Sequence, residues 1–137
     1  MPNHSLTKLL LVDDDPDFLI IAKFCLENLQ GVAIKYVSSG QEAIHESLIF
    51  KPDLILLDVM MPRMDGLTTL KAMRLIPALA HIPVVFFTAK VQKDEISTFL
   101  KAGAIDVITK PFDPQTISSN ILAIWEKYVK ELYEKPT

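Results

Sequence analysis

The feature that most constrains the fold of this chain is a regular alternation between short β-rich runs and longer segments with helical spacing. The five expected strands cover residues 8–12, 32–37, 53–57, 83–87 and 105–108. Each has about the ordinary strand length of five or six residues. Because strands that alternate with helices usually pair in parallel, the pattern predicts a parallel sheet with crossover helices.

Residues at the segment boundaries predict where the five helices begin and end. Asp15-Pro16 is typical of an N-cap followed by proline at the first helical position, and Ser39 with Glu42 has the spacing of a capping box. The first helix is expected to end at Gly31 and the second at about residue 50. The third helix is expected to follow Asp65-Gly66. The fourth is expected to present Ile96, Phe99 and Leu100 on one face ahead of Gly103, and the fifth is expected to begin at Asp113-Pro114.

The third and fourth expected strands are apolar without alternation, so both of their faces must be covered. Right-handed crossovers then give an α/β fold with three layers, a five-stranded sheet between two layers of helices. In such a fold ligands bind at the carboxyl ends of the strands. The sequence therefore predicts both the architecture and the edge at which a functional site should lie.

Length and composition predict one soluble cytoplasmic domain. A chain of 137 residues, half of them hydrophobic, is long enough for one core. The net charge of -3 comes without a basic stripe, which argues against direct binding of nucleic acid. A single cysteine, Cys25, fits a reducing compartment, and no apolar run has the length of a signal peptide or a membrane span.

Acidic residues gather where two of the strands end. Asp13, Asp14 and Asp15 follow the first strand and Asp58 follows the third. Helix capping accounts for Asp15, but it does not account for Asp13, Asp14 and Asp58. Two like charges within 4 Å repel by about 4 kcal/mol at an effective dielectric constant near 20, so such a group needs a cation or a proton. Oxygen ligands favour Mg²⁺, Mn²⁺ or Ca²⁺.

Two further polar residues end the remaining strands on the same edge. Thr88 follows the fourth strand and Lys110 follows the fifth, and both are residue types that bind phosphate. Three aspartates and one lysine carry a local charge of -2, which one divalent ion balances. We therefore expect this edge to accept a phosphoryl group on a carboxylate.

These motifs, in this order, resemble the receiver domain of two-component response regulators. The resemblance rests on Val12-Asp13-Asp14, the segment 57–66, Thr88-Ala89 and Lys110-Pro111-Phe112. It implies a flavodoxin-like sheet of strand order 2-1-3-4-5, with residues 1–7 as an extension, 8–125 as the receiver domain and 126–137 as an extension of the last helix. It also implies a cis peptide bond between Lys110 and Pro111.

The resemblance assigns roles to the residues at the strand ends. Asp58 becomes the phosphoacceptor, while Thr88 and Lys110 contact the phosphoryl group. Mg²⁺, which Mn²⁺ could replace, is expected on Asp13, Asp14, Asp58 and the backbone carbonyl of Met60. Met60 and Lys90 are expected to border the phosphoryl group and to influence its lifetime.

The resemblance also implies a signalling module that assists its own phosphorylation and dephosphorylation and is not an enzyme in its own right. The expected donor is a sensor histidine kinase or a histidine phosphotransfer protein. The expected recipient is a downstream effector or an output domain, reached through the fourth helix, the fifth strand and the fifth helix. No contact with a membrane is expected.

Two features depart from the bare family pattern. Val107 occupies a position where receivers commonly carry a Tyr or Phe whose ring moves with the phosphate-sensing threonine, so we expect the signal to pass mainly through the fourth helix. The fifth helix, expected over 115–133, is longer than the sheet requires and carries two apolar stripes. The second stripe favours a homodimer contact or a helical lead into an output domain.

Other functions were weighed against this interpretation. Asp13 and Asp15 imitate the motif of a haloacid-dehalogenase-type phosphatase, but Pro16 follows where glycine is usual and Asp58 would have no role. A calcium loop fails at Phe18 and Phe24, and a flavin binder fails because the carboxylates would repel the flavin phosphate. A receiver that never accepts phosphate would not need the complete acidic set.

Overall fold

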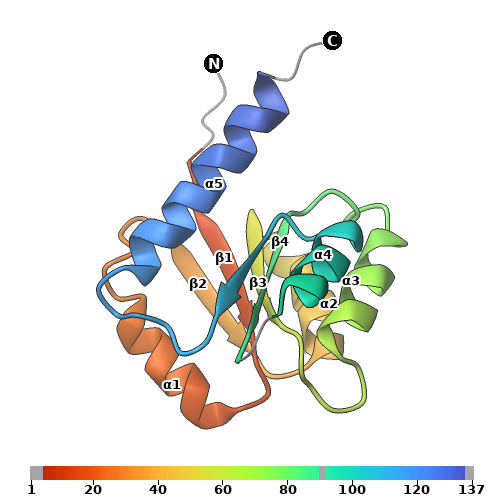
Figure 1. Ribbon diagram of the computed structural model, residues 1–137, viewed down its shortest axis with the longest axis horizontal. Coiled ribbons are helices and arrows are strands. Elements are labelled where there is room, and N and C mark those ends of the chain that lie inside the picture. The colour runs from red at the N-terminus through yellow and green to blue at the C-terminus, as the bar shows by residue number, and fades with distance from the viewer. Residues whose placement is uncertain (1–4, 90–91, 135–137) are drawn as a thin grey trace.

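Five parallel strands form one sheet in the order β2-β1-β3-β4-β5, which confirms the expected flavodoxin-like topology (Figure 1). The computed structural model describes residues 5–89 and 92–134. The strands are β1 (Lys8–Val12), β2 (Ala33–Val37), β3 (Leu54–Asp58), β4 (Val84–Thr88) and β5 (Asp106–Thr109). The last three lie one residue later than the sequence pattern predicts, so Asp58 and Thr88 are themselves strand residues.

The five helices are α1 (Pro16–Cys25), α2 (Gly40–Phe50), α3 (Gly66–Arg74), α4 (Lys93–Lys101) and α5 (Ile117–Tyr133). α1 and α5 cover one face of the sheet, and α2, α3 and α4 cover the other (Figure 1). This arrangement gives the three layers that the sequence predicts. None of these helices combines the length and hydrophobicity needed to cross a lipid bilayer, within the residues described.

The central strands divide their side chains between two cores. On β3, Ile55 and Leu57 pack toward α2, α3 and α4, whereas Leu54 and Leu56 pack toward α1 and α5. All four are completely buried, as the unbroken apolar run predicts. Burial of each such side chain contributes about 1.5–3 kcal/mol to folding, so β3 is firmly held between the two layers.

Helix caps agree with the sequence pattern in most details. The carboxylate of Asp15 accepts from the Asp17 amide, and that of Asp65 accepts from the Thr68 amide. The Ser39 hydroxyl accepts from the Glu42 amide, as in a capping box. The carboxylate of Glu42, however, accepts from the amide of Ser38 instead of Ser39, so the reciprocal bond is displaced by one residue.

Two helix boundaries need correction, the end of α1 and the start of α5. α1 ends at Cys25, and the turns that follow carry the chain to Gly31, whose φ of +76° suits glycine. α4 carries Ile96, Phe99 and Leu100 ahead of Gly103 as expected, and of these three only Phe99 is buried. α5 begins at Ile117 and not at residue 115, because Asp113 accepts from the Gln115 amide and forms a separate turn before the helix.

The two ends of the described chain lie at the amino edge of the sheet (Figure 1). Leu6 is buried in the core, and the amide and hydroxyl of Thr7 both donate to the carboxylate of Asp53. These two residues of the expected N-terminal extension therefore pack as part of the domain. α5 continues past this edge of the sheet toward the C-terminus.

Candidate functional site

Sheet register brings the polar strand ends together at the carboxyl edge. Val12 is aligned with Leu57, so Asp13, the next residue, lies beside Asp58 at the end of β3. Thr88 ends β4 and is aligned with Thr109, and Lys110 follows β5 directly. The amide of Lys110 donates to the Thr88 carbonyl at 2.8 Å, which continues the ladder to the site.

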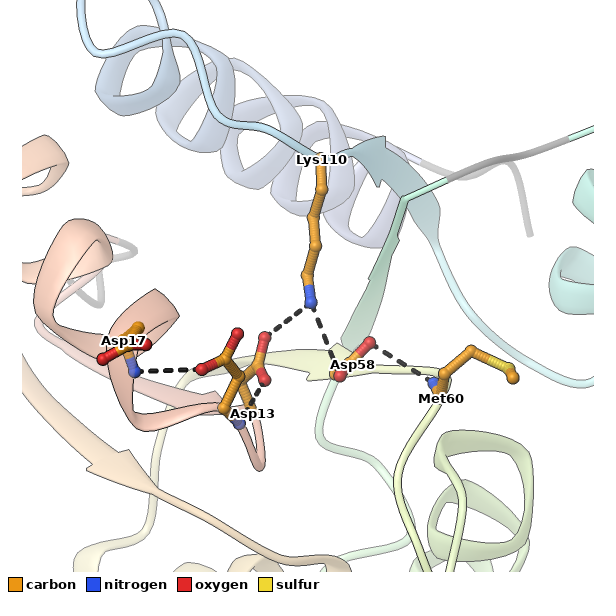
Figure 2. A network of polar contacts seen from close by, with 6 residues as sticks. Asp13, Asp17, Asp58, Met60 and Lys110 are labelled. Atoms are coloured by element: carbon orange, nitrogen blue, oxygen red, sulfur yellow. Dashed lines mark hydrogen bonds and ion pairs between the residues drawn. The ribbon is translucent and has the colours of Figure 1, made fainter.

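Lys110 is the central cation of this edge. Its Nζ lies 2.6 Å from Oδ2 of Asp13 and 3.5 Å from Oδ2 of Asp58, and Figure 2 shows the side chain reaching down between the two carboxylates. Oδ1 of Asp13 accepts from the amide of Asp15 at 2.8 Å, so Asp13 is held from both sides. The peptide bond between Lys110 and Pro111 is cis, as the resemblance implies.

The carboxyl group of Asp58 has an altered acidity. Burial is the main cause that raises its pKa to about 6, and the negative charge of Asp13 adds to the increase. The ammonium of Lys110 and the amide of Met60, which donates to Oδ1 of Asp58 at 3.3 Å, lower it in part. A carboxylate with this pKa is ionised at neutral pH but is poorly solvated, which suits a nucleophile.

Asp13, Asp14 and Asp58 each offer a carboxylate oxygen, and these oxygens lie within 4.8 Å of one another. Asp13 and Asp58 are buried, whereas Asp14 is exposed and opens the cluster to solvent. Hard oxygen ligands with an open side suit a small divalent cation that keeps several waters, which is the habit of Mg²⁺. Asp15 is exposed and caps α1, as expected.

Thr88 is buried at the end of β4, two residues after Phe86. The ring of Phe86 lies 5.2 Å from that of Phe99 on α4. Val107 is partly buried and packs against the same core. Because the residue is a valine, this position contributes no aromatic ring. Lys90, which the sequence placed beside the phosphoryl group, lies outside the described residues.

Two features of the site had not been predicted. A Cβ added to Gly66 would collide with the carbonyl oxygen of Asp58, so the start of α3 rests directly on the backbone of that residue. The sequence signal for this contact is the glycine of Asp65-Gly66, which by itself predicts only the start of a helix. The ammonium of Lys110 lies close to the rings of both Phe18 and Phe87, and nothing local in the sequence indicates this contact.

The fold and the acidic edge together define a flavodoxin-like domain with a carboxylate cluster at the carboxyl ends of its strands. The sequence model of the response regulator receiver domain matches residues 9–122, and the chain therefore belongs to that family.

Individual relatives agree with this assignment. The alkaline phosphatase synthesis transcriptional regulatory protein PhoP of Bacillus subtilis is 35% identical over 117 residues, which cover 85% of this chain and 48% of PhoP. The chain thus spans about half the length of the curated relatives it matches. Among solved structures, the chemotaxis protein CheY4 of Vibrio cholerae has a TM-score of 0.78 at 25% identity, covering 88% of this chain and 99% of CheY4. The N-terminal domain of a response regulator receiver protein from Methanoculleus marisnigri has a TM-score of 0.70 at 34% identity, covering 85% and 94%.

Proposed function

We propose that Asp58 accepts a phosphoryl group from the phosphohistidine of a sensor histidine kinase or a histidine phosphotransfer protein in the cytoplasm. The observation that carries the proposal is the buried Asp58 carboxylate with an ammonium at 3.5 Å and two further carboxylates in reach of a shared cation. Neither a capping role nor a packing role accounts for this combination of charges.

In the proposed reaction a carboxylate oxygen of Asp58 attacks the phosphorus atom of the donor. The new O–P bond forms as the P–N bond breaks, and the bonding pair returns to the imidazole nitrogen, which takes a proton from solvent. Lys110 would pair with the incoming phosphoryl oxygens, and the hydroxyl of Thr88 would donate to one of them.

Asp13, Asp14 and Asp58 fit a resident Mg²⁺, with Mn²⁺ as a substitute. These carboxylates would hold the ion, together with the Met60 carbonyl that the family resemblance implies. When bound, the ion supplies positive charge that makes the negative phosphoryl group tolerable beside three carboxylates. Attack of water on the phosphorus later breaks the O–P bond and restores the Asp58 carboxylate. The domain thus assists a change in its own state and needs no pocket for a small substrate.

We infer that phosphorylation is transmitted mainly through α4. A shift of Thr88 toward the phosphoryl group would disturb the end of β4, where Phe86 contacts Phe99 of α4. Val107 has no ring to exchange between inward and outward positions, so the contact of Phe86 with Phe99 is the aromatic route from β4 to α4. The face formed by α4, β5 and α5 would then present the change to an effector or an output domain. An α4 that stays in place on phosphorylation while another surface moves would refute this route.

A second copy of the chain is a further proposed partner. Leu122, Trp125, Val129 and Leu132 recur along α5 at spacings of three, four and three. The set is symmetric about residue 127, so an antiparallel copy aligns Leu122 with Leu132 and Trp125 with Val129. Leu122, Trp125 and Val129 line a groove of about 670 Å³, together with the charged residues Glu126, Lys130 and Glu134.

Incubation with Mg²⁺ and acetyl phosphate, followed by mass spectrometry, tests the main proposal. The wild-type chain is expected to gain one phosphoryl group, Asp58→Asn none, and Lys110→Ala little. A haloacid-dehalogenase-type phosphatase would instead turn over many equivalents, and that activity would depend on Asp13. Labelling that survives in Asp58→Asn would assign the acceptor to another residue.

A further inference from the structure

Lys110 lies against two aromatic rings as well as two carboxylates. Its Nζ is 4.4 Å from the ring centroid of Phe18 and 5.0 Å from that of Phe87. The two rings are nearly parallel, at an interplanar angle of 21° and a centroid separation of 5.5 Å. Both distances from the ammonium are within the range at which a cation is attracted to the face of a ring.

The rings come from separate parts of the fold and brace one another. Phe18 is the third residue of α1, and Phe87 is completely buried in β4. Phe112, two residues after Lys110, contacts both rings at 5.2 and 5.5 Å. The position of the rings is therefore fixed by the core and does not depend on Lys110.

This environment differs from the other cation–ring contacts of the described chain. Lys8 lies 5.6 Å from the ring of Phe50 and Lys23 lies 5.2 Å from that of Tyr36, each over a single ring and each exposed. Lys110 has two rings, a shorter distance and a side chain that is only 18% exposed. An incidental surface contact does not account for the arrangement.

We propose that Phe18 and Phe87 are positioning residues for phosphoryl transfer, which act by holding the ammonium of Lys110 at the acceptor carboxylate. The inference rests on the proposed function. A lysine side chain has several rotatable bonds, and one at the rim of a sheet tends to extend its charge into water. Two ring centroids and two carboxylate oxygens within 5.0 Å of Nζ leave the ammonium little freedom to move away from the acceptor carboxylate.

The rings would act before and after transfer. Before it, they exclude water from one side of the ammonium, which strengthens its attraction to Asp13 and Asp58. After it, the phosphoryl oxygens compete with Asp13 for the same ammonium, and the rings keep Nζ within reach of both. A side chain of similar bulk without a ring face would fill the same space but would not attract the cation.

The test compares Phe18→Leu with Phe18→Tyr, because leucine keeps the apolar contact and tyrosine keeps the ring. Phe24→Leu is the matched control, since Phe24 lies on the same helix but is 69% exposed. Phosphorylation by acetyl phosphate at saturating Mg²⁺ is expected to be about fivefold slower in Phe18→Leu, in keeping with one lost cation–π contact. The phosphorylation rates of Phe18→Tyr and Phe24→Leu should stay within about twofold of the wild-type rate. Equal loss in the leucine and tyrosine variants would show that Phe18 acts only through packing, and the proposal would fall.

Nuclear magnetic resonance of the Lys110 side chain gives a reading independent of phosphorylation. Protons held over a ring face are shifted upfield, so the ε-methylene of Lys110 should be shifted in wild type and Phe18→Tyr and should return toward an ordinary value in Phe18→Leu. Unshifted Lys110 signals in the wild type would overturn the inference. If the wild type accepts no phosphoryl group, the proposed function fails, and these signals still decide whether the rings hold the lysine.

Discussion

Replacing Asp58 with asparagine should make the metal-free domain more stable. The side chain is 5% exposed, and burial with the charge of Asp13 raises its pKa from 3.8 to about 6. At 1.36 kcal/mol per pH unit the ionised carboxylate destabilises the folded state by roughly 3 kcal/mol. The exposed Asp14 marks an open side where water screens part of this effect, so we expect a gain of about 1–3 kcal/mol.

The gain should depend on pH in a defined direction. Because the pKa of Asp58 is raised on folding, the folded protein binds a proton between about pH 4 and pH 6 that the unfolded chain releases. The destabilisation by the ionised Asp58 carboxylate is therefore complete at pH values above the pKa of this group in the folded protein, and it disappears as the pH falls toward 4. The difference in stability between Asp58→Asn and wild type should be large at pH 7.5 and small at pH 4.5.

Urea unfolding followed by circular dichroism, with EDTA present, measures this difference. Lys110 remains paired with Asp13 at 2.6 Å in the variant, so its ammonium is not left unpaired. Asp14→Asn is the control, because it removes one negative charge from the same cluster at an exposed position and should stabilise less. Equal stability of Asp58→Asn and wild type at pH 7.5, or a gain that is unchanged at pH 4.5, would refute the reasoning.

Four further predictions concern the same molecule. The rate of phosphorylation should fall as the pH drops below about 6, because protonated Asp58 is not a nucleophile, and a flat rate between pH 5 and 8 would contradict this. Saturating Mg²⁺ should raise the unfolding midpoint of wild type, and calorimetry should show weaker Mg²⁺ binding in Asp14→Asn. Gly66→Ala should lower the free energy of unfolding by about 2 kcal/mol or more, because the added methyl group overpacks against the Asp58 backbone. Gly31→Ala, whose methyl group would meet no atom within 4 Å, should lower it by only about 1 kcal/mol, because of the positive φ at that position. In sedimentation at rising concentration wild type should dimerise and Val129→Glu should remain monomeric; a monomeric wild type would exclude the proposed contact.

Much of the fold can be predicted from local sequence patterns, because strand burial and helix capping depend on residues that are close together in the sequence. The apolar runs of β3 and β4 are buried on both faces, and aspartate caps begin α1 and α3 where the sequence places them. The carboxyl-edge residues are predicted for the same reason, since the ends of parallel strands must share an edge. The order of the strands follows only from the family resemblance, because short apolar runs do not indicate which strands are neighbours in the sheet.

What the sequence could not predict depends on contacts between distant segments. Phe18 and Phe87 meet at Lys110 although they come from α1 and β4, and an apolar residue in either element predicts only burial. Ile96 and Leu100 fit a helical stripe, but the narrow contact of α4 leaves them exposed. The same narrow contact is consistent with a helix that repacks at modest cost.

α5 begins seven residues after Lys110 and runs past the opposite end of the sheet (Figure 1). Its 17 residues form a rod about 25 Å long, so a tilt of about 5° at its first turn would displace Tyr133 by about 2 Å. A small adjustment near the chemistry would thus reach the far pole of the domain as a larger swing, in the manner of a lever. Anything attached to or resting on that end of the helix would experience amplified motion without touching the acidic edge.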